Sequence, residues 1–232
     1  MKFAKIAVVL LIISSITFAQ NGDGKKTHFK SFADSVSYCI GQNLGKNLND
    51  PSMEINFDLV TEGIKDFLKG SSLLNEEEMQ KVLMAFNQKL MAKKNEAAAA
   101  ESANNKKEGE AFLAENKKKK DIKTLPDGLQ YKVLVKGKGA SPIETSTVKV
   151  NYRGTLIDGT EFDSSYKRGE PAEFPVDRVI KGWTEALQLM HVGDKWQLFI
   201  PSDLAYGDNA AGQLIKPGST LIFEVELLDI VK

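Results

Sequence analysis

Cysteine and histidine are nearly absent from this sequence of 232 residues. The single cysteine, Cys39, excludes a disulfide within one chain and any metal site built from several cysteines. The two histidines, His28 and His191, lie far apart in the sequence, which disfavours a zinc enzyme or a histidine-based triad. Net charge is absent as well, because 31 lysines and arginines balance 31 aspartates and glutamates. Coating nucleic acid needs a positive surplus, so we expect no nucleic-acid partner.

The first 19 residues have the three-part order of a secretory signal peptide. Two lysines open the chain, an apolar run follows at 6–18, and a small-residue cleavage pattern ends at Ala19. The run is shorter than the about 20 residues that a membrane-spanning helix needs, which disfavours the alternative of an uncleaved N-terminal anchor. Gln20 stands where a lipoprotein would need cysteine. We therefore predict removal of residues 1–19, a flexible leader at 20–30, and export to the periplasm or the cell exterior.

Residues 31–120 have helical spacing and predict an all-α region. A first helix is indicated by apolar residues that recur at steps of four, at Val36, Ile40, Leu44 and Leu48. The sequence Asn-Asp-Pro at 49–51 predicts where this helix ends. A second, short helix fits residues 57–69, because its apolar residues again fall on one face, and Gly70 follows it.

The third predicted helix is long. It begins at Asn75, which forms a capping-box pattern with Glu78, and no proline interrupts the chain before Lys120. Gly109 is its only weak point as a helix former. Large apolar side chains are absent between 92 and 109, so this stretch is not the buried face of a core. Its alanine, lysine and glutamate content favours a solvated stalk helix over the alternative, a disordered linker.

Two features follow the stalk. Phe112 and Leu113 are large apolar residues, and we expect them to dock on the domain that comes next. The four lysines at 117–120 are interpreted as a solvated helix end, where cations are favourable. A contact with an anionic surface is the alternative for this lysine run.

The helices at 31–91 are too small to form an independent core. About sixty residues bury little apolar surface, and two copies packed together would bury more. We therefore predict a homodimer through residues 31–91. Cys39 lies in this apolar region and is interpreted as a small buried hydrophobe, with an intermolecular disulfide as the alternative.

The period of the apolar pattern changes to two in residues 121–232. Alternating residues predict half-buried antiparallel strands at 147–152, 195–200 and 221–227, and one short helix fits 183–190. An antiparallel sheet wrapped on one helix is an α+β domain. The predicted architecture is therefore this α+β domain, preceded by the all-α dimerisation region with its long stalk helix.

No nucleophile–base pattern or phosphate-binding loop is present in this domain, so any chemistry must be noncovalent. Aromatic residues are its most notable feature, although most aromatics in proteins are packing residues. Trp196 is interpreted as core, whereas Trp183, after a glycine at a helix start, could form the floor of a pocket. The aromatics are Tyr152, Phe162, Tyr166, Phe174, Trp183, Trp196, Phe199, Tyr206 and Phe223.

Several stretches of the domain closely resemble the FKBP-type peptidyl-prolyl cis–trans isomerases, and they occur in the right order: 150–166, 179–183, 204–207 and 221–228. The helical arm, including 109–116 and 128–133, resembles the Mip/FkpA subgroup of secreted bacterial FKBPs. The resemblance covers nearly the whole chain after the signal peptide. It implies an intertwined N-terminal dimer, long stalk helices and C-terminal isomerase domains in a V-shaped assembly.

The resemblance also implies a proline-binding pocket with defined residue roles. Trp183 would lie under the proline ring, and the Tyr206 hydroxyl and the Ile180 N–H would donate hydrogen bonds to substrate carbonyls. Asp163 would be held by Tyr152 and Arg168. The residues carried over as catalytic are Tyr152, Phe162, Asp163, Tyr206 and Phe223, and those carried over as substrate-binding are Arg168, Val179, Ile180, Trp183, Leu214 and Ile215.

Two positions depart from the best-known family members. Ala172 stands where a bulkier apolar residue is usual, and Ala211 stands where some members carry histidine. The loop at 213–217 also has fewer prolines. These departures bear on substrate preference and on affinity for a rapamycin-like macrolide ligand more than on activity. No metal and no cofactor are expected.

The mechanism expected of such a pocket is twisting of an X–Pro amide, whose resonance gives a barrier of ~18–20 kcal/mol. Apolar surroundings disfavour the polar planar amide, and hydrogen-bond donors hold the peptide in a pose that fits the twisted state. We therefore expect the partners to be unfolded or partly folded proline-containing polypeptides, and the function to be assistance in folding of exported proteins. The alternative is a noncatalytic dimeric chaperone or peptide-binding module that uses the same cleft.

Overall fold

The computed structural model describes residues 29–50 and 53–231. The chain forms two compact units, Met1–Phe57 and Asp58–Lys232. The predicted signal peptide at 1–19 lies outside the described residues, as does most of the predicted leader at 20–30. Within the described part, no helix has both the length and the apolar character needed to cross a membrane.

The helix of the first unit is α1 (Phe32–Leu48). Ser31 caps it by accepting a hydrogen bond from the Asp34 N–H at 3.1 Å, and it ends just before the Asn-Asp-Pro sequence that predicted its end. No residue of α1 is buried, and the apolar side chains of Val36, Ile40 and Leu44 are exposed. Cys39 is exposed too, so its interpretation as a buried residue is wrong for the described residues of a single chain.

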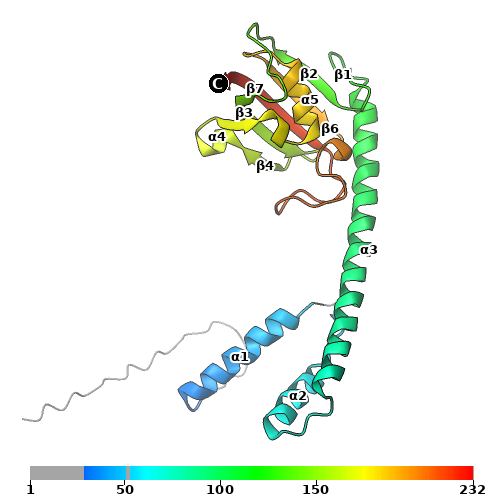
Figure 1. The fold of residues 1–232 in the computed structure, drawn as a ribbon, viewed down its shortest axis with the longest axis vertical. Helices are drawn as coiled ribbons and strands as arrows, with labels where there is room; N and C mark the ends of the chain where they lie inside the picture. Colours follow the sequence, from blue (N-terminus) through cyan, green and yellow to red (C-terminus); the bar gives the residue numbers. More distant parts are fainter. Residues whose placement is uncertain (1–28, 51–52, 232) are drawn as a thin grey trace, which may run out of the picture. The chain divides into compact units, whose positions relative to one another are not determined.

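The second unit begins with two further helices (Figure 1). The helix α2 (Phe57–Lys69) has the predicted bounds, and the helix α3 (Glu76–Asn116) starts with the predicted capping box between Asn75 and Glu78. Its 41 residues span about 62 Å at 1.5 Å per residue. The prediction of a helix rather than a disordered linker is confirmed, since the helix continues without a break through the alanine-rich stretch. It is not solvated on every side, because Ser102 and Gly109 are buried.

The structure corrects the prediction for the last turns of α3. The helix ends at Asn116, four residues before Lys120, because the buried Asn116 side chain donates a hydrogen bond to the Gln130 side chain at 3.0 Å. The lysines that follow are exposed. Phe112 docks on the next domain as expected, with its ring centroid 6.0 Å from that of Phe199. Gly109, the weakest helix former of this stretch, is buried against Thr220.

Seven antiparallel strands form one sheet in the order β1-β2-β6-β7-β3-β4, and β5 pairs with β3 beside this path. The predicted bounds of β6 are confirmed, whereas β3 and β7 are longer than predicted. The strands are β1 (Lys123–Thr124), β2 (Gln130–Val135), β3 (Thr147–Leu156), β4 (Glu161–Ser164), β5 (Ala172–Pro175), β6 (Lys195–Ile200) and β7 (Leu221–Val231).

The core lies between this sheet and α5 (Lys181–Leu189), as Figure 1 shows. Along β7 the side chains alternate strictly, with Leu221, Phe223, Val225 and Leu227 buried. Leu187 of α5 is fully buried and belongs to the same hydrophobic cluster. The predicted α+β domain is therefore confirmed, and burial of one face of the sheet accounts for the period of two. Three short elements connect the strands: α4 (Ser165–Arg168), η2 (Val176–Arg178) and η3 (Ser202–Leu204).

Candidate active site

Five aromatic rings from five different elements meet at one side of the core. Trp183 lies at their centre and is only 4% exposed. Its ring makes edge contacts with Tyr152 at 5.3 Å and Phe223 at 5.2 Å between centroids. Edge-to-face packing of this kind adds to the burial of each ring. We call the five residues the aromatic cluster: Tyr152 of β3, Phe162 of β4, Phe174 of β5, Trp183 of α5 and Phe223 of β7.

Gly154 is what allows two of these rings to approach β3. It pairs with Asp163 on one side and Phe223 on the other. A Cβ at this position would lie 2.5 Å from the Phe162 ring and 2.8 Å from the Phe223 ring. Sequence reasoning assigned no role to Gly154, although a glycine inside a strand is a recognised sign of close approach.

A polar network joins three residues beside the aromatic cluster. The Tyr152 hydroxyl donates to Asp163 Oδ2 at 2.5 Å, and Arg168 donates to Asp163 Oδ1 at 2.5 Å and to the Tyr152 oxygen at 2.8 Å. The Ser164 N–H also binds Asp163 Oδ1, at 2.8 Å. The contacts expected for Asp163 are therefore present, and both of its carboxylate oxygens accept hydrogen bonds.

The network fixes the protonation state of its members. Burial disfavours the Asp163 carboxylate, but hydrogen bonds from Tyr152 and Arg168 outweigh it and hold the pKa of Asp163 below its usual range. Burial, together with the hydrogen bond to Asp163, raises the pKa of the Tyr152 phenol. At neutral pH Asp163 is therefore an acceptor and Tyr152 a protonated donor.

Val179 and Ile180 lead into α5, and both pack against the hydrophobic core. Ile180 is the N-cap residue, and its carbonyl accepts hydrogen bonds from the N–H groups of Trp183 at 2.9 Å and Thr184 at 3.1 Å. Its own N–H has no hydrogen-bond partner among residues 29–50 and 53–231. The start of α5 thus holds a backbone donor in a fixed place next to Trp183.

Tyr206 follows η3 and is 42% exposed. Its hydroxyl also has no hydrogen-bond partner within the described part of the chain. The neighbouring residues Ala205 and Ala211 pack against the core, and Ile215 belongs to it. Leu214 is exposed and lies outside the hydrophobic cluster.

Ala172 of β5 also packs against the core, next to the strand that carries Tyr152.

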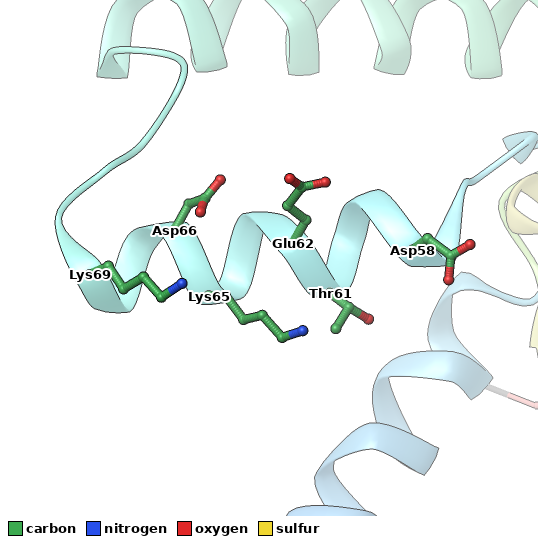
Figure 2. A pocket seen from close by; sticks show the side chains of 6 residues that line it. All are labelled: Asp58, Thr61, Glu62, Lys65, Asp66 and Lys69. Carbon is green, nitrogen blue, oxygen red and sulfur yellow. The ribbon is translucent and has the colours of Figure 1, made fainter.

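Two hollows elsewhere in the described chain lie on helices. One, of about 570 Å³, is lined by side chains of α3 and contains no residue of the aromatic cluster. The other, a shallow hollow of about 400 Å³, is lined by six side chains that all belong to α2, and Figure 2 shows them along one helix face. They are Asp58, Thr61, Glu62, Lys65, Asp66 and Lys69. This is a mixed-charge helix surface that contains no residue of the aromatic cluster. No group of three or more metal-ligating side chains occurs within the described ranges.

The chain belongs to the FKBP-type peptidyl-prolyl cis–trans isomerase family. The model of that family matches residues 138–228, and the model of the domain amino-terminal to it matches residues 33–133. Outer membrane protein MIP of Legionella longbeachae is 45% identical over 100% of this chain and 98% of that protein. FkpA of Aeromonas hydrophila, named an FKBP-type peptidyl-prolyl cis–trans isomerase, is 42% identical over 90% of this chain and 81% of its own.

Comparison of the fold with solved structures supports the same family. The crystal structure of FkpA from Escherichia coli superimposes with a TM-score of 0.70 and 38% identity, covering 88% of this chain and 98% of that chain. The predicted isomerase class is therefore confirmed, and the alternative of a noncatalytic chaperone or binding module is not favoured.

Proposed function

We propose that the aromatic cluster, together with the Ile180 N–H and the Tyr206 hydroxyl as donors, isomerises X–Pro bonds in exported polypeptides. The observation that carries the proposal is an aromatic cluster around Trp183 in a domain that also holds two donors without a partner among the described residues, the Ile180 N–H and the Tyr206 hydroxyl. An apolar surface accepts the proline ring, and the donors bind the carbonyls on either side of it.

The chemistry needs no covalent bond. The planar amide is stabilised by charge separation, so an apolar surrounding lowers its advantage over the twisted form. Donors that hold the peptide in a turn-like pose bind the twisted state better than the planar one, which lowers the barrier. Phe162 and Phe223 enlarge the apolar surface, and the Tyr152–Asp163–Arg168 network fixes its polar edge.

An isomerisation assay on a short prolyl peptide tests these roles. Tyr206→Phe removes one donor and leaves the ring, so we expect kcat/KM to fall by about 5- to 20-fold. The matched control is Tyr166→Phe, because Tyr166 is similarly exposed but lies outside the aromatic cluster. Unchanged activity in Tyr206→Phe would remove this donor from the mechanism, and absence of activity in the unmutated chain would overturn the function itself.

We propose that the substrates are proteins of the cell envelope or exterior, reached after cleavage following Ala19. The name of the Legionella longbeachae relative supports an envelope location. N-terminal sequencing of protein from fractionated cells tests this, and a mature chain that begins at Gln20 in the exported fraction is the expected result. A chain that still begins at Met1 in the cytoplasmic fraction would contradict it.

We also propose a homodimer through residues 31–91. Support comes from the exposed apolar side chains of α2, among them Ile64, Phe67 and Leu68, which would be costly to leave in water. Light scattering should give twice the chain mass, and Phe67→Glu should reduce it. Lys65→Glu, on the polar face shown in Figure 2, is the matched control and should leave the dimer intact. A monomer mass for the unmutated chain would overturn this part.

A rapamycin-like macrolide is proposed to bind the same aromatic surface. Such a ligand carries an apolar ring and carbonyl oxygens, which match the cluster and its two donors. We expect inhibition that is competitive with the prolyl peptide. Because Ala172 leaves less apolar contact than a larger residue, Ala172→Ile should tighten binding. Noncompetitive inhibition would place the macrolide elsewhere.

A further inference from the structure

The loop that follows Tyr206 is closed at its base. The Gly218 N–H donates to the Gly207 carbonyl at 2.8 Å, so the ends of residues 207–218 meet. Within the loop, Ala211 and Ile215 form an isolated antiparallel bridge with N···O distances of 2.9 and 3.3 Å. We call the Gly207–Gly218 junction the loop base. Tyr206 directly precedes it, so whatever holds the loop base also limits the motion of Tyr206.

The helix α3 contacts the residues at the start of this loop through Asp208. Asp208 Oδ1 accepts a hydrogen bond from Ser102 Oγ at 2.5 Å and lies 2.8 Å from Lys106 Nζ. The same ammonium group lies 3.5 Å from Asp203 Oδ1 in η3. Lys106 therefore contacts carboxylates three residues before and two residues after Tyr206.

The residues at the end of the loop, Pro217 and Gly218, contact the same helix through their backbone. Asn105 Nδ2 donates to the Pro217 carbonyl at 2.7 Å. Gly218 has a φ of +76°, and a Cβ there would lie 2.4 Å from the Ser102 carbonyl oxygen. About two helical turns beyond Ser102, Gly109 meets Thr220 so closely that a Cβ would lie 2.1 Å from Thr220 Oγ1. The loop base therefore lies against the backbone of α3.

The contacting residues of α3 share one face of the helix, since 102, 105, 106 and 109 are spaced at three and four residues. Both charged partners remain ionised at neutral pH. The hydrogen bond with Asp208 raises the pKa of Lys106, and the hydrogen bond from Lys106 lowers the pKa of Asp208. This face consists of small and polar residues, and none of its contacts is needed to bury the hydrophobic core.

We propose that Ser102, Asn105 and Lys106 are positioning residues for the isomerase site, because they hold the loop base and thereby fix the Tyr206 hydroxyl. The inference rests on the proposed role of Tyr206 as a substrate donor. It makes the end of the stalk helix part of the catalytic machinery and predicts that the activity depends on residues well outside 121–232. None of these three side chains touches the substrate.

The test is a double-mutant cycle in the full mature chain with a prolyl-peptide assay. Ser102→Ala combined with Lys106→Met removes both side-chain contacts to Asp208 and keeps the aliphatic stem. We expect kcat/KM to fall by about 3- to 10-fold, with a smaller effect on the unfolding temperature than a core substitution would have. Lys107→Met, at an exposed position on the same helix, is the matched control and should change nothing. Lys106→Arg should preserve activity because it keeps both ion pairs.

The same pair of substitutions is then made in the Tyr206→Phe background. If the helix acts through the Tyr206 hydroxyl, the further loss there should be less than about twofold, because the group being positioned is gone. An equal loss in both backgrounds would overturn the proposal, since it would indicate a general structural effect. The proposal would also be overturned if the Ser102→Ala and Lys106→Met pair left the activity unchanged in a chain that keeps Tyr206. An active chain that is insensitive to Tyr206→Phe would instead refute the donor role, so the two failures are distinguishable.

Discussion

The Tyr152 hydroxyl and the Asp163 carboxylate are joined by a 2.5 Å hydrogen bond across the β3–β4 pair, and Arg168 contacts both. This contact sets the charge at the edge of the aromatic cluster. Since the pKa of Asp163 is held below its usual range in the folded protein, the contact stabilises the fold above the unfolded pKa. That contribution is lost only as the pH falls through the folded pKa.

The first prediction follows for Asp163→Asn. At pH 7 this variant should unfold at a lower temperature than the unmutated chain, and its activity should fall several-fold, because Tyr152 and Arg168 lose their charged acceptor. As the pH falls from about 4 through the lowered pKa of folded Asp163, the difference between the unfolding temperatures should shrink, since the carboxylate becomes protonated. Thermal unfolding from pH 3 to 8 checks this. A constant difference at every pH would contradict the assigned charge.

Gly154 gives the second prediction. Gly154→Ala places a methyl group against the rings of Phe162 and Phe223, so it should destabilise the fold by about 1–3 kcal/mol and lower activity. Gly63→Ala is the matched control, because a Cβ at Gly63 in α2 meets nothing within 4 Å. Denaturant unfolding of both variants measures the effect. Equal stability of Gly154→Ala and the unmutated chain would show that the rings can move apart.

A third prediction concerns Glu185 of α5. A hydrogen bond with Asp127, together with burial and the charge of that carboxylate, raises the pKa of Glu185 from 4.5 to about 7. Between these values the folded state holds a proton that the unfolded chain has released, so stability falls as the pH rises through this window. Glu185→Gln should match the unmutated chain at pH 5 and unfold about 1–3 °C higher at pH 8.

The control for this pH effect is Glu170→Gln, because Glu170 is exposed. It should shift the unfolding temperature equally at both pH values. If Glu185→Gln behaved in the same way, the carboxylate pair would not be responsible for the pH dependence.

The fourth prediction concerns Asp194, a buried carboxylate that belongs neither to the aromatic cluster nor to its polar network. It is 3% exposed and accepts hydrogen bonds from the N–H groups of Gly137 and His191, both at 2.6 Å. Asp194→Asn replaces one acceptor oxygen by a donor, so one of these two N–H groups loses its partner and stability should fall by about 1–3 kcal/mol. Asp177→Asn is the exposed control. Activity per folded molecule should be unchanged, because Asp194 only joins two loops.

Local signals in the sequence predicted most of the fold. The alternation at 195–200 gave the bounds of β6, and the capping box gave the start of α3, because both depend on neighbouring residues. The end of α3 and the exposure of Cys39 were not predicted correctly. The end of α3 depends on a contact with Gln130, which comes later in the chain. The exposure of Cys39 depends on which segments or further copies pack on α1.

The candidate site likewise contains contacts that were expected and contacts that the sequence did not indicate. The contacts of Asp163 with Tyr152 and Arg168 were expected only through the family resemblance, since no spacing rule indicates them. Ser102 and Asp208 lie 106 residues apart, and polar residues on a polar helix give no periodic signal. Their contact therefore becomes visible only in the folded chain.

The central claim is that the aromatic cluster catalyses isomerisation rather than merely binding unfolded chains. Its most direct test is refolding of a protein limited by a cis-proline step, with the mature chain at about one hundredth of the substrate concentration. The account predicts a refolding rate that rises in proportion to the added chain and falls in the Tyr206→Phe variant. An unchanged rate, with only the final yield improved near equal concentrations, would contradict it and indicate a holding chaperone.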